Sequence, residues 1–225
     1  MLQTGREEIV VPETLTRRRL GEARDKRDGF SLLEVLMVVG ITTVVAAIAV
    51  PMMKNTIGDF KLSGDARALT NAVSLAKLRA ASDFSQSRLY VDRDARSYHV
   101  EVWAKTAVPP DWVTEGGLTS LSTSDIFSFG VVGAAPLNTQ AAIAHAPACL
   151  TRLGAAIVNT SCILFNSRGI PVDSAGVPPA VGAPTGNDAI YITDNTAVFG
   201  VTISATGLIK LWRTNPWAAP AWVLQ

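Results

Sequence analysis

The distribution of apolar and polar residues divides the chain into three parts. Residues 1–29 are mostly polar and charged, whereas residues 30–50 are almost entirely apolar. Beyond them, polar and apolar residues alternate over shorter distances. An α-helix over residues 30–50 is roughly 31 Å long, which matches the thickness of the hydrocarbon core of a bilayer. We therefore predict a membrane-spanning helix over residues 30–52.

A second helical pattern follows the apolar segment. Apolar side chains then recur every three or four residues, as on one face of an amphipathic helix. They are Leu62, Ala66, Leu69, Val73, Ala76 and Ala80. Together the two patterns predict one helix from Phe30 to about Ser82, with its amphipathic part over residues 53–82. Pro51 should kink this helix, because proline lacks the backbone donor and its ring clashes with the preceding turn.

Residues 83–225 favour β-strands. Short runs rich in β-branched and aromatic residues alternate with segments rich in Gly, Pro and Ala. The predicted strands cover residues 88–92, 97–104, 126–132, 162–166, 189–193, 197–205 and 208–213. Residues 133–147 and 169–186 are predicted loops. We expect an α+β fold, in which the amphipathic half of a long N-terminal helix covers a C-terminal antiparallel sheet system.

Charge adds a direction to the predicted membrane helix. Basic residues precede the apolar segment, namely Arg17, Arg18, Arg19, Lys26 and Arg27. Such residues mark the cytoplasmic side of a membrane helix, so the N-terminus should be cytoplasmic and the C-terminal domain should lie outside the cytoplasm. The formal net charge of the whole chain is only +1, which gives no support for nucleic-acid binding by the body.

The chain contains two cysteines, Cys149 and Cys162. In an exported domain they could form a disulfide worth about 2–4 kcal/mol. The alternative is that both are unpaired and pack as small hydrophobic residues. Their spacing does not match a zinc site.

A short motif at the head of the apolar segment carries the strongest functional signal. Glu34 lies four residues into this segment, where a carboxylate costs roughly 2.5–3.5 kcal/mol on insertion scales. Its presence therefore indicates that the carboxylate has a function. Gly29 and Phe30 followed by Glu34 resemble the prepilin peptidase site of type IV pilins and type II secretion pseudopilins. The resemblance implies that residues 1–29 are a leader removed after Gly29. It also implies that the new amine of Phe30 is methylated and pairs with Glu34 of a neighbouring subunit.

Two simpler explanations of this segment remain. Residues 46–49 form a weak site for ordinary signal peptidase, which would remove the apolar segment instead. Alternatively, the segment is a plain membrane anchor, and Glu34 reaches the lipid headgroups.

A second resemblance lies in the C-terminal half. Phe165, Ser167, Arg168 and Gly169, followed later by the segment 206–210, resemble H-type pseudopilins and minor pilins of the FimT and FimU type. That family folds as a long N-terminal helix packed on two antiparallel sheets. The resemblance implies a minor subunit of a type II secretion pseudopilus or a type IV pilus, without a cofactor.

The same resemblance implies where the protein acts and with which partners. The partners would be other pilins or pseudopilins, prepilin peptidase and the bacterial inner membrane. The protein would cross that membrane once, with its β-rich domain in the periplasm, before it enters the filament. The motifs do not separate the two filament systems.

The C-terminal tail concentrates tryptophan and a few basic residues. Trp212, Trp217 and Trp222 lie in a proline-bearing stretch that could dock another subunit or pack back on the domain. Family members that bind DNA during natural transformation carry several arginines near the end of the chain. Here only Lys210 and Arg213 are basic, and DNA affinity grows with the number of phosphates neutralised. A DNA-binding minor pilin is therefore the weaker alternative.

Catalytic and metal-binding patterns find little support. His99 and His145 lack the accompanying acid and nucleophile of a catalytic triad. Asp92 and Asp94 fit a hairpin turn better than a calcium loop. We therefore expect neither an enzyme nor a metal site.

Overall fold

The structure is a computed structural model that describes residues 30–174, 180, 182–186 and 188–225. The chain divides into two units, residues 1–47 and residues 48–225. Gly29 and the predicted leader lie outside the described residues.

One long helix, α1, extends over Leu32–Ser82. Ser31 caps its N-terminus: the Ser31 Oγ accepts a hydrogen bond from the Leu33 amide, and the Ser31 carbonyl accepts one from the Glu34 amide. The helix therefore starts two residues later than predicted. It includes Pro51, and the kink at this residue stays a prediction.

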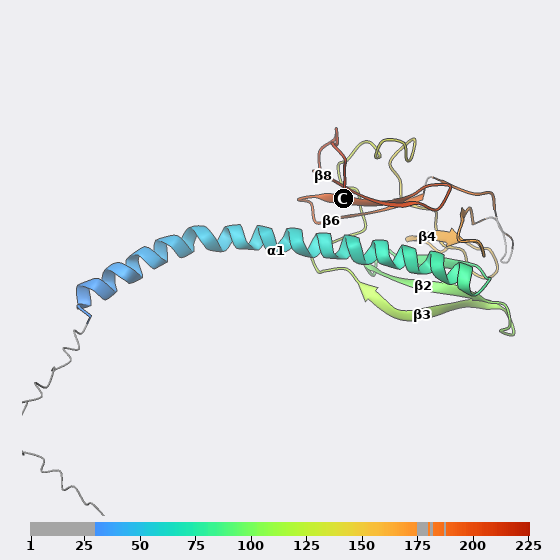
Figure 1. Ribbon diagram of the computed structural model, residues 1–225, viewed down its shortest axis with the longest axis horizontal. Coiled ribbons are helices and arrows are strands. Elements are labelled where there is room, and N and C mark those ends of the chain that lie inside the picture. Colours follow the sequence, from blue (N-terminus) through green and yellow to red (C-terminus); the bar gives the residue numbers. More distant parts are fainter. Residues whose placement is uncertain (1–29, 175–179, 181, 187) are drawn as a thin grey trace, which may run out of the picture. The chain divides into compact units, whose positions relative to one another are not determined.

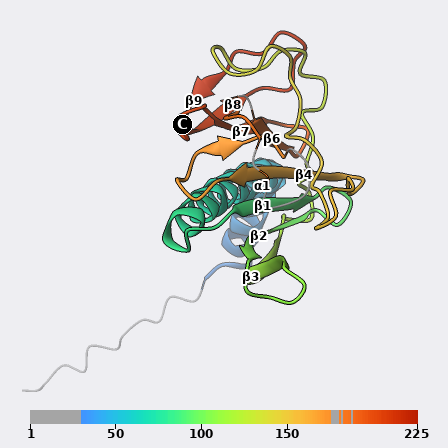
Figure 2. The ribbon, with the colours of Figure 1, turned by 90° about the vertical axis from the view of Figure 1, so that its right-hand side faces the viewer.

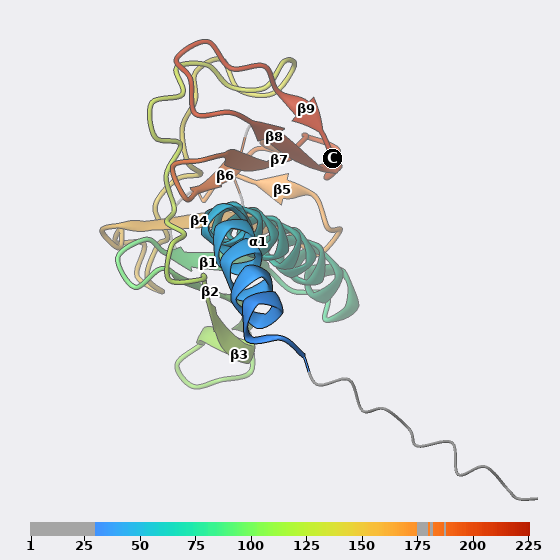
Figure 3. The same ribbon diagram turned by 90° about the vertical axis from the view of Figure 1, so that its left-hand side faces the viewer.

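The amphipathic part of α1 forms the centre of the body. All six residues of the predicted apolar stripe are fully buried, which confirms the pattern. They pack in one core with residues of both sheets, among them Ile163, Phe165, Ile190 and Ile192. Figures 1 and 3 show this part of α1 with strands of one sheet on one side and strands of the other sheet on the opposite side.

The first sheet is five-stranded and antiparallel, in the order β3-β2-β1-β4-β5. Its strands are β1 (Ser87–Asp92), β2 (Ser97–Ala104), β3 (Asp111–Ser120), β4 (Thr160–Phe165) and β5 (Pro171–Val172). The second sheet is four-stranded and antiparallel, in the order β6-β7-β8-β9. It comprises β6 (Asp188–Thr193), β7 (Val198–Ile203), β8 (Ile209–Thr214) and β9 (Val223–Leu224). Figure 2 shows the two sheets as separate layers of the body. The α+β fold with two antiparallel sheets is confirmed.

One predicted strand is wrong. Within residues 126–132, only Ile126 pairs in the β manner, through an isolated bridge to Thr193. Gly130 has a φ of +57°, and the Val132 amide bonds to the Phe129 carbonyl, so the chain turns instead of extending.

Three strands were missed by the sequence pattern: β3, the two-residue β5 inside the predicted loop 169–186, and the two-residue β9. β3 is an edge strand that carries Gly116 and Gly117, and most of its side chains are exposed. Since neither face of β3 is regularly buried, its sequence lacks the alternation that marks a strand.

Candidate functional site

The described part of the N-terminal motif is the exposed start of α1. The side chain of Phe30 is 82% exposed, and Glu34 lies in the first turn. A carboxylate in the first turn interacts favourably with the helix dipole, typically by 0.3–1 kcal/mol. Moreover, Ser31 and Glu34 have the spacing of a capping box. Both the spacing from Ser31 and the position in the first turn favour helix initiation at this point.

The apolar segment of α1 has the length and composition of a membrane span. Leu32–Val50 has a mean hydropathy of 2.4, and none of it is buried inside the protein. By length and composition, it is the one described helix that could cross a bilayer.

The turn after β4 contains the second predicted motif. The Asn166 Oδ1 accepts hydrogen bonds from the amides of Arg168 and Ile170, and Gly169 has a φ of +71°. This is a tight turn that returns the chain into β5, and its geometry requires glycine at position 169.

Two glycine turns from different sheets meet on Lys77 of α1. The Lys77 Nζ donates to the Gly207 carbonyl at 2.8 Å. A Cβ at Gly169 would lie 3.2 Å from the Lys77 Cγ, and a Cβ at Gly207 would lie 3.0 Å from the Gly169 carbonyl oxygen. Both segments that carry the family resemblance therefore form a structural junction between the helix and the two sheets.

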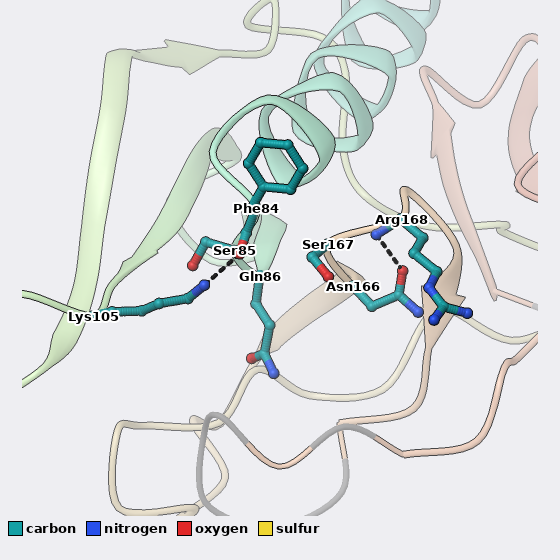
Figure 4. Close-up of a pocket in the computed structure, with 7 residues that line it drawn as sticks. All are labelled: Phe84, Ser85, Gln86, Lys105, Asn166, Ser167 and Arg168. Atoms are coloured by element: carbon teal, nitrogen blue, oxygen red, sulfur yellow. Dashed lines mark hydrogen bonds between the residues drawn. The ribbon is translucent and has the colours of Figure 1, made fainter.

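A pocket opens beside this turn, at the C-terminal end of α1. It has a volume of about 360 Å³ and is lined by Phe84, Ser85, Gln86, Lys105, Asn166, Ser167 and Arg168. Figure 4 shows Lys105 on one side of the pocket and the turn with Ser167 and Arg168 on the other. The Lys105 Nζ donates to the carbonyl of Phe84. Sequence reasoning did not identify Phe84 or Lys105.

The C-terminal tail is partly packed and partly exposed. Trp222 packs on Tyr191 with ring centroids 5.9 Å apart, and its Nε1 donates to the Ala134 carbonyl. The Trp212 Nε1 donates to the Thr202 Oγ1. In contrast, Trp217 is 68% exposed. Of the three tryptophans, Trp217 is therefore the one available for another molecule.

The two basic residues of the tail are engaged within the body. The Arg213 Nη2 lies 3.5 Å from an oxygen of Asp59, and the Lys210 Nζ lies 5.8 Å from the ring centroid of Trp212. These contacts give no support to the DNA-binding alternative.

Cys149 and Cys162 form a disulfide with an S–S distance of 2.01 Å. Both residues are buried, and Cys162 lies on β4. The disulfide ties the loop before β4 to the first sheet.

A polar cluster covers the outer face of the first sheet. The Arg88 Nε lies 2.5 Å from Glu101, and its guanidinium lies 4.1 Å from the ring centroid of Trp112. Burial lowers the pKa of Arg88. Burial alone would raise the pKa of Glu101, but the hydrogen bonds and charges of His99 and Arg88 outweigh it and hold this pKa below its usual value. The geometry describes a buried ion pair that supports the sheet.

The other histidine is a core residue. His145 contacts the rings of Phe129 and Tyr191, and its Nδ1 accepts a hydrogen bond from the Tyr191 amide. Burial lowers the pKa of His145 to about 4, so its imidazole is neutral at pH 7.

Carboxylates gather where α1 meets the loop before β4. The Asp65 Oδ2 accepts the Ser122 amide, and the fully buried Asp125 accepts the Ser124 hydroxyl. Burial, and then the neighbouring Asp65 and Asp194, raise the pKa of Asp125 to about 6. Among the described residues, no group of three or more His, Cys, Asp or Glu side chains could hold a metal ion.

Comparison with known proteins identifies the N-terminal feature. Residues 24–50 match the family model of the prokaryotic N-terminal methylation motif. The chain carries the N-terminal motif of type IV pilin-like proteins. Proteins that carry this motif are structural subunits and not enzymes.

The other comparisons add little about function. No curated protein matches the chain. Among solved structures, it is similar to the minor pseudopilin EpsH from the Type 2 Secretion System of Vibrio cholerae. The two share 12% sequence identity and a TM-score of 0.34, over 73% of this chain and 96% of EpsH. At this TM-score the likeness carries no argument about function.

Proposed function

We propose that the chain is a minor subunit of a type II secretion pseudopilus or a type IV pilus. The observation that carries this proposal is the methylation motif at the head of α1, where Phe30 is exposed, Ser31 caps the helix and Glu34 occupies the first turn. Prepilin peptidase would cut after Gly29, and the new amine of Phe30 would be methylated. The helix of the mature protein would then begin two residues after its N-terminus.

The exposed apolar helix supports a membrane and filament role. No residue of Leu32–Val50 is buried within the chain, so another apolar environment must cover this segment. We propose that this environment is the inner membrane before assembly and the bundle of helices from other subunits afterwards. The N-terminus would be cytoplasmic and the β-rich body periplasmic.

Mass spectrometry of the mature N-terminus tests this proposal. The full chain is purified from membranes of its native host, and the N-terminal peptide is sequenced. We expect a peptide that begins at methylated Phe30. A matched host strain without prepilin peptidase should yield the intact leader. An N-terminus near Val50, or an intact leader in the native host, would show that the proposal is wrong.

A further inference from the structure

Phe84 has an unfavourable backbone conformation for an aromatic residue. It follows the end of α1 with a φ of +48°, in the left-handed region. The Ser85 amide bonds to the Ala80 carbonyl, which places Phe84 at the position that glycine usually occupies after a helix. A side chain with a Cβ is disfavoured there.

The other left-handed positions are occupied by polar side chains. The described non-glycine residues with positive φ besides Phe84 are Arg96, Asn138, Asn159 and Asn195. Asparagine tolerates this conformation better than most residues. Phe84 is thus the one apolar residue among the described residues that adopts it.

Packing within the chain does not compensate for this conformation. The side chain of Phe84 is 76% exposed, so it contributes little to the core. Because no packing within the chain offsets the unfavourable backbone conformation, the Phe84 side chain is a candidate for contact with another molecule.

The surroundings of Phe84 are cationic. Lys105 and Arg168 line the same pocket and are exposed, and neither forms an ion pair with a described residue. The lining residues include no carboxylate. The nearest carboxylate along the chain, Asp83, accepts a hydrogen bond from the Ser82 hydroxyl. A pocket that contains an exposed aromatic ring and is lined by two cations without an ion pair suits an apolar side chain adjacent to a carboxylate.

The pocket lies at the other end of α1 from the apolar segment. About 50 Å of helix separates Val50, where the apolar segment ends, from Ser82, two residues before Phe84.

We propose that Phe84, Lys105 and Arg168 form a docking surface for an acidic segment of another pilin-like subunit. An apolar side chain of that segment would cover the Phe84 ring, and its carboxylates would pair with Lys105 and Arg168. This inference rests on the proposed function, because it assigns the partner to the same filament.

Photo-crosslinking in the native host tests the surface. The full chain carries p-benzoyl-phenylalanine in place of Ser167, which is exposed and lines the pocket. We expect a crosslink to a chain that itself carries an N-terminal methylation motif, through a peptide that contains Asp or Glu. The combined Lys105→Glu and Arg168→Glu changes should lower the crosslink yield about tenfold. No crosslink, or a crosslink only to proteins without that motif, would overturn the proposal.

Phe84→Gly separates docking from a structural role. Glycine removes the left-handed strain, so the thermal midpoint of the purified full chain should rise by roughly 2–4 °C. The crosslink yield from position 167 should nevertheless fall about tenfold, because the aromatic contact is lost. Asn138→Gly is the matched control, since it relieves another exposed left-handed residue and should leave the yield unchanged. A lower midpoint for Phe84→Gly, or an unchanged yield, would overturn the proposal.

The N-terminal peptide of each variant distinguishes a failure of the docking surface from a failure of the proposed function. Methylated Phe30 in all variants, together with an unchanged yield for Phe84→Gly, would contradict the docking surface alone. Absence of methylated Phe30 in the unmodified chain would contradict the proposed function.

Discussion

Glu34 has two roles that a single substitution can separate. Its capping-box spacing from Ser31 favours the start of α1, and as a charge it is proposed to pair with the Phe30 amine of a neighbouring subunit. Glutamine also fits the capping box but carries no charge. Glu34→Gln therefore removes the proposed pairing and keeps the cap.

We expect Glu34→Gln to be cleaved and methylated normally but to co-purify with other pilin-like subunits at least a hundredfold less. The reason is that a charge left unpaired in an apolar interior costs about 3–5 kcal/mol. Ser31→Ala is the control, because it removes a cap worth about 1 kcal/mol without a change in charge. Equal recovery of Glu34→Gln and the unmodified chain would leave Glu34 with its local role only.

The two last tryptophans should respond differently to the same substitution. Trp222 packs on Tyr191 and bonds to Ala134, so Trp222→Ser should destabilise the body by about 2–4 kcal/mol, measured by urea unfolding. Trp217 is exposed, and Trp217→Ser should change stability by less than about 0.5 kcal/mol. If Trp217 docks another subunit, its loss should lower co-purification with that subunit. Unchanged co-purification would exclude docking through Trp217.

At the scale of elements, the contact between α1 and the loop around Asp125 should respond to pH. The raised pKa of Asp125 means that the folded body binds a proton more tightly than the unfolded chain does. This contribution to stability is therefore lost as pH rises from about 4 through about 6. Asp188 acts in the same direction, since burial, and then Asp173, raise its pKa to about 6.

Asp125→Asn isolates the first of these contributions. Asparagine keeps an acceptor for the Ser124 hydroxyl and carries no charge beside Asp65. We expect the thermal midpoint to rise at pH 7 and to change less between pH 4 and 6 than in the unmodified chain. Circular dichroism at several pH values would measure both. Parallel pH profiles for the two chains would show that Asp125 does not titrate in this range.

Elements that a local sequence pattern specifies could be predicted. Features that depend on contacts between residues far apart in the sequence could not. The buried stripe of α1 follows from periodicity alone, so Leu62 and Leu69 were placed correctly in the core. β3 was missed because exposure and two glycines remove its alternation. The contact of Lys77 with Gly207 joins residues 130 positions apart, and no local pattern encodes it. The exposure of Phe84 could not be predicted, because it depends on the backbone conformation at the end of α1.

At the scale of the whole molecule, the disulfide and the apolar helix both bear on the cellular location of the body. A disulfide persists in the periplasm and is rare in the bacterial cytoplasm. The bond between Cys149 and Cys162 in the body is therefore consistent with the proposed export of residues that follow the apolar segment. The basic residues before that segment favour the same orientation.

Labelling in intact spheroplasts tests this orientation. A membrane-impermeant maleimide should label an added cysteine at Ala95 (Ala95→Cys), which is exposed and lies outside the proposed docking surface, while the paired Cys149 and Cys162 stay unlabelled until a reductant is added. In a strain that lacks periplasmic thiol oxidation, Cys149 and Cys162 should be labelled after denaturation without a reductant. Because the pair closes a loop between residues 13 positions apart, its loss should also destabilise the body by about 2–4 kcal/mol. Labelling of Ala95→Cys only after cell lysis would place the body in the cytoplasm, and the pseudopilus or pilus assignment would then fail.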